Sequence, residues 1–260
     1  DLVDILSEQK ITKLANYAIS DSTIVNIGDR DFVDYRPDVS IDPQVLKENN
    51  ISSISFDSLH FFQVQNLVEE IDTKSVKIKK SDVAVNLILP KTYEEYLESL
   101  TKKNRHELRR KKRKFDNETT SYELGESKEQ DIFDIFISQH RESKGEKGEF
   151  MTEVVETYFR NLLNLQGWRI YYTNTDKGVL STAFCYENDD GCYLYNSSRN
   201  NEFNSINPGI VLNDLIIQQL IDRGMAFFDF LKGTEKYKYD LGGNSVQLYD
   251  LAIELWIFYK

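Results

Sequence analysis

The spacing of apolar side chains changes several times after residue 150, and these changes constrain the fold more than any other feature. Residues 154–163 are apolar at every third or fourth position, which predicts an amphipathic helix that stops near Gln166-Gly167. Three segments rich in aromatic and β-branched residues follow, separated by Asp-Lys-Gly and Asp-Asp-Gly turns. They predict an antiparallel three-stranded meander over residues 168–172, 179–186 and 192–196.

The chain after this meander predicts a further helix followed by two strands. Pro208-Gly209 precedes an apolar-rich segment over residues 210–221, and Arg223-Gly224 follows it. Proline near a helix start and glycine beyond its end are matching boundaries. Residues 225–231 predict a buried strand, and residues 245–254 predict a last one. This order of elements predicts an α/β fold with a mixed sheet.

The N-terminal part is less regular but also predicts a mixed α/β unit. Strand-like pieces lie around residues 24–27, 51–56 and 83–89. Pro90 ends the last of these pieces, and Thr92 can cap a helix that begins at Tyr93. We therefore place a domain boundary near Pro90, between an N-terminal unit over residues 1–90 and a C-terminal domain over residues 91–260.

Composition narrows the class of protein. The 260 residues are 40% hydrophobic, which is enough for packed cores. No run approaches the roughly 20 apolar residues of a bilayer-spanning helix. The N-terminus lacks a basic-then-apolar leader, so we expect a cytoplasmic protein, although the sequence begins without Met. A net charge of −11 argues against general nucleic-acid binding.

The cysteines and histidines predict neither a disulfide nor a metal site. Cys185 and Cys192 lie in alternating apolar segments, so we expect them to be small buried side chains. The chain has only 3 His and 2 Cys, well separated in sequence. This inventory gives no pattern of metal ligands.

Asn207-Pro208-Gly209 opens the second predicted helix and is a candidate phosphate site. A helix start carries unpaired backbone N–H groups and a partial positive charge, which together bind phosphates. Gly209 allows a ligand to approach, Asn207 can accept hydrogen bonds from the first turn, and Pro208 removes a donor that would need a partner. Asn196 and Ile210 complete the candidate donor site. Many helices begin in this way for structural reasons alone.

Segments in both halves together resemble one protein family. They are Leu89-Pro90, residues 93–96 and Leu100, residues 104–114, Gln139-His140-Arg141 with Gly145, Gly148 and Phe150, Asn207-Pro208-Gly209, residues 228–233 and residues 235–238. In this order and spacing they resemble the GNAT acyltransferase superfamily over about residues 25–254. They are most similar to its CelD-like acetyltransferases of cellulose biosynthesis.

The resemblance implies a tandem GNAT-like acyltransferase fold of two mixed-sheet units. Residues 1–90 would be a degenerate unit on the acceptor side, and residues 91–260 the acyltransferase domain. It implies acyl-CoA, with acetyl-CoA expected, as the co-substrate. It also relates the chain to the Fem-type aminoacyl transferases, which use aminoacyl-tRNA to build peptidoglycan bridges. One departure is that Ser205-Ile206-Asn207-Pro208-Gly209 replaces the glycine-rich pyrophosphate loop of the superfamily.

A basic run is the strongest local charge feature. Nine Lys or Arg residues lie within residues 102–114, so a helix there would be charged on nearly every face. It can be a solvated surface helix, a patch for the phosphates of a donor or a nucleotide-linked acceptor, or a nucleic-acid or membrane patch. The resemblance favours the second interpretation, with Arg105 and Arg109 as candidate substrate ligands. A tRNA-linked donor would also bind such a helix.

His140 and Arg141 end a helical segment just before a loop that contains Gly145 and Gly148. A polar helix end is the simpler interpretation. The alternative is recognition of the acceptor, because Arg141 can bind a carboxylate or phosphate through two hydrogen bonds.

The candidate chemistry is concentrated in residues 229–238. Asp229 lies in an apolar segment, where an ionised carboxylate is costly unless it is paired, hydrogen-bonded to backbone or catalytic. Acyl transfer to an amine needs a base, a donor to the oxyanion and an acid for the thiolate. Asp229 or Glu235 can be the base, Lys238 or a backbone N–H the oxyanion donor, and Tyr195 or Tyr237 the acid.

Three functional hypotheses follow from these features. The first is an acyl-CoA-dependent N-acyltransferase that acts on an amino sugar or another amine in envelope or polysaccharide synthesis. The second is transfer of an amino acid from tRNA to an envelope precursor. The third is a non-catalytic binding module that keeps the fold, because a fold does not fix a function.

Overall fold

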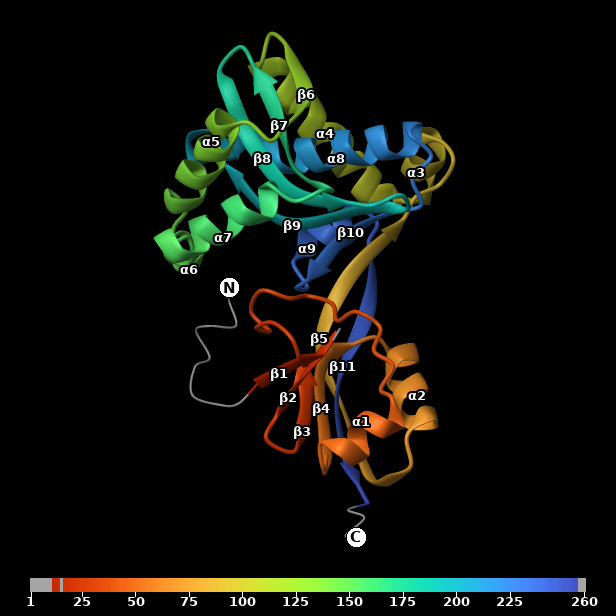
Figure 1. The fold of residues 1–260 in the computed structure, drawn as a ribbon. Coiled ribbons are helices and arrows are strands. Elements are labelled where there is room, and N and C mark those ends of the chain that lie inside the picture. The colour runs from red at the N-terminus through yellow and green to blue at the C-terminus, as the bar shows by residue number, and fades with distance from the viewer. Residues whose placement is uncertain (1–10, 15, 257–260) are drawn as a thin grey trace. The chain divides into compact units, whose positions relative to one another are not determined.

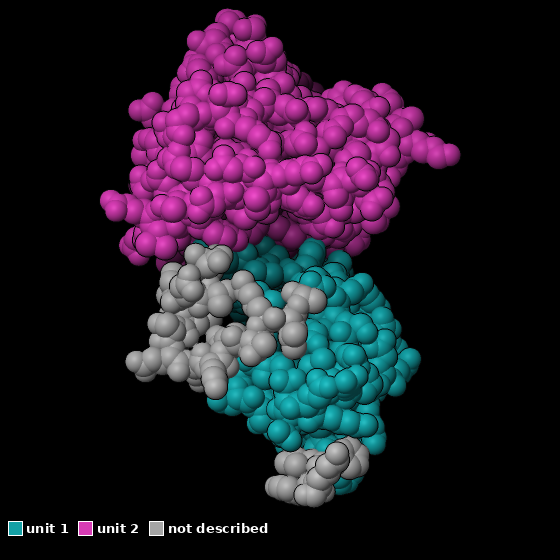
Figure 2. Space-filling view, in the orientation of Figure 1, with its two compact units in different colours: residues 1–84, 232–234, 245–260 teal, residues 85–231, 235–244 magenta. Residues whose placement is uncertain are grey.

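The computed structural model describes residues 11–14 and 16–256. Its contacts divide the chain into two compact units (Figure 2). Unit 1 comprises residues 1–84, 232–234 and 245–260, and unit 2 comprises residues 85–231 and 235–244. The boundary expected near Pro90 would make each unit one continuous segment. In the structure, unit 1 also includes residues 232–234 and the C-terminal segment 245–260. The change of unit falls inside the long strand β5 (Thr73–Ile88), where no turn or composition shift marks it.

The described residues of unit 1 form a small sheet with two helices. Its strands follow the order β1–β2–β3–β4–β11–β5, and the remaining bounds are β1 Ile11–Leu14, β2 Tyr17–Ser20, β3 Thr23–Asn26, β4 Ser53–Leu59 and β11 Asn244–Leu255. The helices are α1 (Pro43–Glu48) and α2 (Phe61–Glu70). Ile24, Ile54 and Leu251 lie in its core. The strands expected around residues 24–27, 51–56 and 245–254 are confirmed.

Unit 2 contains the predicted meander. Its strands follow the order β5–β10–β9–β8–β7–β6, with bounds β6 Tyr122–Ser127, β7 Trp168–Thr175, β8 Gly178–Glu187, β9 Gly191–Arg199 and β10 Phe227–Lys232. Strands β6 to β9 pair antiparallel, and β10 pairs parallel with β9. The meander and the strand after the second helix are therefore confirmed, and the fold is mixed α/β.

Helices cover both faces of the sheet in unit 2 (Figure 1). Successive residues of β8 show this, because neighbouring side chains of a strand point to opposite faces. Phe184 packs on Phe136 and Phe159, from α5 (Gln130–Arg141) and α7 (Glu153–Leu163). Cys185 belongs instead to the core that includes Leu212 of α8 (Pro208–Asp222).

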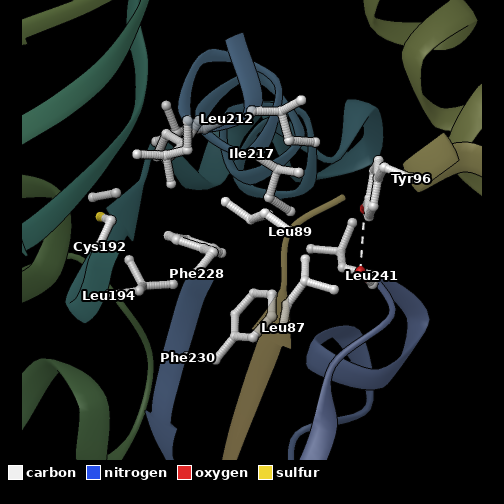
Figure 3. Packing of buried hydrophobic residues seen from close by; sticks show 14 of the residues in the cluster. Leu87, Leu89, Tyr96, Cys192, Leu194, Leu212, Ile217, Phe228, Phe230 and Leu241 are labelled. Atoms are coloured by element: carbon white, nitrogen blue, oxygen red, sulfur yellow. Dashed lines mark hydrogen bonds between the residues drawn. The ribbon is translucent and has the colours of Figure 1, made fainter. Parts of the chain in front are cut away.

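The core of unit 2 positions the ends of β9 and β10. Leu194 and Phe230 lie in it beside α8, and Tyr96 of α3 (Tyr93–Ser99) donates a hydrogen bond to the carbonyl of Leu241 at 3.1 Å (Figure 3). Thr92 caps α3 by accepting from the backbone N–H of Glu95, as predicted.

The two cysteines behave as the sequence predicted. Cys185 and Cys192 are both buried and free of disulfides. They lie in the same core cluster of unit 2. Their role is therefore that of small apolar side chains.

The remaining elements of unit 2 are a basic helix and three short helices. The basic run forms α4 (Lys102–Glu118). The short ones are α6 (Glu146–Phe150), the 3-10 helix η2 (Asn201–Ile206) and α9 (Lys236–Asp240). Over the described part of the chain, no helix combines the length and the apolar character that crossing a bilayer would require.

Candidate functional site

Strands β9 and β10 run parallel over a short distance and are paired no further in the described residues. Their register extends from Gly191 and Phe227 to Tyr193 and Asp229, although both strands continue. The register of β9 with β8 shifts at the same place, where Cys185 faces Leu194 and Phe184 faces Asn196. A bulge at Tyr195 thus lies just beyond the paired part of β9 and changes the direction of the strand.

Helix α8 begins after β9 with Pro208 at its first position. Asn207 adopts a left-handed backbone with φ of 56° and makes no side-chain capping bond, so the capping role expected for it was wrong. Its side chain instead lies near the carbonyl of Ser205 at 3.4 Å. A methyl group added to Gly209 would meet nothing within 4 Å. The first turn of α8 is therefore open to a ligand at Gly209, while Ile210 packs against the core.

Asp229 is buried in β10 and both of its carboxylate oxygens are occupied. One accepts from the side chain of Asn86 at 2.8 Å and the other from the backbone N–H of Leu231 at 2.7 Å. Leu231 has a left-handed φ of 58°. The carboxylate therefore stabilises a strained backbone position at the end of β10, which is the structural alternative considered for it.

Lys238 and Glu235 form an ion pair at the start of α9. The Nζ of Lys238 lies 3.0 Å from a carboxylate oxygen of Glu235 and 3.4 Å from the carbonyl oxygen of Leu231. The side chain of Lys238 is only 3% exposed, whereas that of Glu235 is 58% exposed. The structure thus places a buried ammonium beside the end of β10 and a solvent-accessible carboxylate next to it.

The two candidate tyrosines have different surroundings. Tyr237 meets Phe230 edge-on at 6.1 Å between ring centroids. Burial and the charge of Glu235 raise the pKa of Tyr237, so its hydroxyl stays protonated at neutral pH. Tyr195 lies among aromatic rings that include Phe159, and its hydroxyl donates to Tyr158 at 3.3 Å. Tyr237 shares a helix with Lys238, and Tyr195 faces α7.

His140 is buried at the end of α5 and contacts β9. Its Nε2 lies 3.1 Å from the Oδ1 of Asn196. The backbone N–H of Ser197 donates to the same oxygen at 2.7 Å, so this oxygen is an acceptor and Nε2 is the donor. Burial and then the charge of Lys147 lower the pKa of His140 to about 4, although its hydrogen bonds act in the opposite direction. The imidazole is therefore neutral at physiological pH.

Arg141 is already bound within unit 2. It donates to a carboxylate oxygen of Glu156 at 2.7 Å and to the carbonyl of Met151 at 3.0 Å. Glu156 belongs to α7, so Arg141 joins the end of α5 to that helix. These partners occupy the Nε and one Nη of the guanidinium.

Arg105 and Arg109 line a separate pocket on α3 and α4. Its volume is about 360 Å³, and its walls are Glu94, Leu97, Glu98, Arg105 and Arg109. Arg105 also donates to the carbonyl of Leu97 at 3.1 Å. None of the candidate residues on β9, β10 or α9 lines this pocket.

A buried ion pair fastens α4 to α8. Lys112 lies 2.7 Å from a carboxylate oxygen of Asp214, whose side chain has no exposed surface. The hydroxyl of Tyr93 also donates to Asp214, at 2.8 Å. One cation of the basic run therefore has a structural role.

Sequence reasoning missed two cations, Lys147 of α6 and Arg199 at the end of β9. Both are exposed, and partial desolvation, followed by the charge of Arg199, lowers the pKa of Lys147 to about 8. In the sequence, Lys147 lies between Gly145 and Gly148, and Arg199 lies between the last strand of the predicted meander and Pro208. The available signal was the position of Arg199 at the end of the strand that precedes the phosphate-binding candidate.

Comparison with known families identifies unit 2. The sequence profile of the Acetyltransferase (GNAT) domain matches residues 102–239, more than half of the chain. The chain belongs to this family. The match runs from the first residue of α4 into α9, so it includes β9, β10 and the start of α8. GNAT membership shows an acyltransferase fold here, and no protein with a curated description matches the chain significantly.

Solved structures share the fold at low sequence identity. FemX matches with a TM-score of 0.59 and 12% identity over 80% of this chain and 73% of its own. A conserved protein of unknown function from Bacteroides thetaiotaomicron VPI-5482 has a TM-score of 0.58 and 9% identity, covering 94% and 85%. The C-terminal domain of a putative lysylphosphatidylglycerol synthetase from Agrobacterium fabrum matches with a TM-score of 0.54 and 11% identity. The match covers 91% of this chain and 79% of that domain. These similarities show the fold alone.

Proposed function

We propose that this GNAT protein transfers an acyl group, with acetyl as the first candidate, from acyl-CoA to an amine acceptor. An amino sugar in envelope or polysaccharide synthesis is the acceptor class that the CelD-like resemblance suggests. The observation that carries the proposal is the end of β9–β10 pairing at Tyr193 and Asp229, followed by the open start of α8 at Gly209. A pantetheine arm can lie between parting strands while backbone N–H groups at a helix start hold its phosphates.

The contacts around α9 divide the catalytic roles among the candidates. Glu235 is the better base, because its carboxylate is exposed whereas both oxygens of Asp229 are occupied. Glu235 would accept the proton that the amine loses as its nitrogen bonds to the thioester carbon. Lys238 would stabilise the negative oxygen that develops there. As the carbon–sulfur bond breaks, Tyr237 would give its proton to the thiolate.

Donor binding is the first test. Acetyl-CoA at ~100 times its dissociation constant should add ~2.7 kcal/mol to the free energy of unfolding. We expect this stabilisation in thermal melts of the full chain, and no stabilisation by adenosine alone. If no acyl-CoA stabilises the protein, the binding-module hypothesis becomes the better account.

Lys238 and Lys236 provide a matched pair for the chemistry, because both lie on α9. Lys236 is 78% exposed and pairs with Asp240. We expect Lys238→Met to reduce the rate of CoA release in the presence of an amine acceptor by about 100-fold or more, the usual loss when one oxyanion donor is removed. Lys236→Met should leave that rate unchanged. Equal rates in the two variants would remove Lys238 from the mechanism.

Aminoacyl-tRNA as donor is the second candidate, and the composition of α4 favours it. Several cations of that helix, such as Lys103, Arg113 and Lys114, have no ion pair among the described residues. Phosphate contacts release counterions, so binding of tRNA would weaken steeply with salt. A filter-binding series over salt concentration, with wild type and Lys103→Gln/Arg113→Gln/Lys114→Gln, tests this donor. Absent or salt-insensitive binding would reject it.

A further inference from the structure

Alternation along β5 and β10 places two polar side chains on the same face of the sheet in unit 2. Phe228 and Phe230 of β10 and Leu87 of β5 lie in the apolar core (Figure 3). Successive side chains of a strand point to opposite faces, so Asp229 and Asn86 lie on the other face. The two strands are neighbours in the sheet, and Asn86 donates to Asp229 at 2.8 Å. The buried Asp229 therefore forms a cross-strand pair with Asn86.

Asp229 also ends the part of β10 that is paired with β9 in the described residues. Its other carboxylate oxygen accepts from the backbone N–H of Leu231 at 2.7 Å. Leu231 has a φ of 58°, which a bulky side chain rarely adopts and which surrounding contacts must hold. The hydrogen bond fixes the N–H of Leu231 in this conformation. Asp229 thus determines how the backbone continues beyond the paired part of β10.

The carbonyl group of the same leucine contacts the ammonium of Lys238. The oxygen of Leu231 lies 3.4 Å from Nζ, and a carboxylate oxygen of Glu235 lies 3.0 Å from it. An ammonium has three donors and no acceptor, so the acceptors around it determine where its N–H groups point. Lys238 is buried, so water does not readily replace a lost acceptor. The position of this ammonium therefore depends in part on Leu231, and through Leu231 on Asp229.

Other contacts hold the backbone of α9. The N–H of Gly243 donates to the carbonyl of Lys238 at 3.0 Å. A methyl group on Gly243 would lie 2.4 Å from the side chain of Val85, so the chain after α9 packs closely on β5. The side chain of Asn104 in α4 donates to the carbonyl of Tyr239 at 3.3 Å. A change in β10 should therefore move the ammonium of Lys238 and leave the helix in place.

We propose that Asp229 and Asn86 are a positioning pair for the ammonium of Lys238. Asn86 orients the carboxylate of Asp229, the carboxylate fixes Leu231, and the carbonyl of Leu231 orients the ammonium. The pair acts through hydrogen bonds, so neither residue needs to touch the substrate or to transfer a proton. The role of Lys238 in acyl transfer rests on the proposed function, whereas the coupling of β5 and β10 to α9 does not.

Three substitutions separate the hydrogen bonds of Asp229 from its charge. Asp229→Ala removes the acceptor of the Leu231 N–H. Asp229→Asn keeps an acceptor oxygen for that N–H, and its amide can pair with Asn86 once the amide of Asn86 is reversed. Asn86→Ala removes only the cross-strand partner. Glu187→Gln is the matched control, because it alters another buried carboxylate of unit 2, whose contacts are with β7 and the end of α8.

The first measurement does not depend on catalysis. The side-chain NMR signals of Lys238 and Lys236 are compared in the full chain with isotope-labelled lysine and without CoA. Asp229→Ala should shift or broaden the Lys238 signal, and Asn86→Ala should do so to a smaller extent. The signal of Lys236, an exposed residue of the same helix, should not change. Asp229→Asn should resemble wild type, and Glu187→Gln should leave both signals unchanged even where it lowers stability.

The second measurement is the release of CoA from acetyl-CoA in the presence of an amine acceptor. Asp229→Ala should lower kcat about ten-fold, the effect of one lost hydrogen bond on a transition state, and should change the KM for acetyl-CoA by less than about two-fold. Asp229→Asn should keep most of the kcat. In a Lys238→Met background, Asp229→Ala should cause no further loss, because two residues that act as one unit are not additive. A merely structural role of Asp229 would not produce this dependence on Lys238.

Several results would overturn the proposal. One is an unchanged Lys238 signal together with an unchanged kcat in Asp229→Ala. Another is an equal loss of kcat in Asp229→Ala and Asp229→Asn, because the charge of the carboxylate would then be what is required. A third is a loss in Asp229→Ala that persists undiminished in the Lys238→Met background. If Asp229→Ala does not fold, Asn86→Ala takes its place in both measurements. If wild type releases no CoA from any acyl-CoA, the proposed function fails, and the lysine signals alone decide whether the pair positions Lys238.

Discussion

Unit 2 contains two charged clusters that differ in burial and in the pairing of their charges. In the Glu187 cluster, the carboxylate of Glu187 accepts from Tyr171 and from Arg223 at 2.8 Å, and Arg169 lies 3.3 Å away. The side chain of Glu187 is 2% exposed. Lys147 and Arg199, by contrast, are both exposed, and neither forms an ion pair with a carboxylate in the part of the chain that the structure describes.

The difference in burial distinguishes charges that the fold needs from charges that a ligand can reach. A buried charge is costly unless it is paired and hydrogen-bonded, so the Glu187 cluster must be satisfied for the chain to fold. An exposed cation has no such requirement, because water solvates it. Its lack of a partner therefore costs little and leaves it available to a ligand. The contrast predicts opposite effects of substitution in the two places.

Removal of the buried carboxylate should have the largest effect on stability. Glu187→Ala leaves Arg223 and Tyr171 without their acceptor, and breaking a buried pair in this way costs about 3–5 kcal/mol. Urea unfolding measures the loss. Glu126→Ala is the matched control, since Glu126 also lies near Arg169, at 3.4 Å, but is 49% exposed. It should cost no more than about 1 kcal/mol. If both variants lost similar free energy of unfolding, burial would not distinguish the Glu187 carboxylate from the exposed Glu126.

The sequence predicted the parts of the fold that depend on local periodicity. The meander, α7, α8 and the last two strands follow from apolar spacing and from glycine or proline at their ends. The start of β5 at Thr73 was missed, because residues before Val83 are mostly polar and exposed on that strand. Its strand conformation depends on pairing with distant segments, which single-sequence patterns do not contain.

The candidate site was less predictable, because its residues meet through tertiary contacts. Asp229 was singled out as a charge in an apolar segment, but its partner Asn86 lies 143 positions earlier. Arg141 looked available, yet it is bound to Glu156. Lys147 carries no local signal apart from its charge, and Arg199 only its position at the end of a strand. Sequence patterns thus located the strands and helices of the site more reliably than the roles of its side chains.

His140 adds a third case to this comparison. It is a buried titratable group without a carboxylate partner among the described residues. Its pKa is lowered to about 4 from 6.5, so the unfolded chain takes up a proton first as the pH falls. Stability from this residue is complete above pH 6.5 and is lost between pH 6.5 and 4. The expected loss is about 3 kcal/mol.

Urea unfolding at pH 7 and at pH 4.5 isolates this contribution when wild type is compared with His140→Gln. The variant should lose clearly less stability than wild type over this interval, because glutamine does not titrate. His106→Gln is the control, since the His106 side chain is 71% exposed. It should lose as much stability as wild type. If His140→Gln did so as well, His140 would not be held neutral by burial.

The exposed pair should give the smallest effect on stability. Lys147→Gln and Arg199→Gln should each change the free energy of unfolding by no more than about 0.5 kcal/mol, as surface substitutions usually do. Urea unfolding at low ionic strength is the measurement, because salt screens such charges. A loss above about 1 kcal/mol in either variant would make that cation part of the folded framework. The contrast with Glu187 would then no longer separate structural charges from charges available to a ligand.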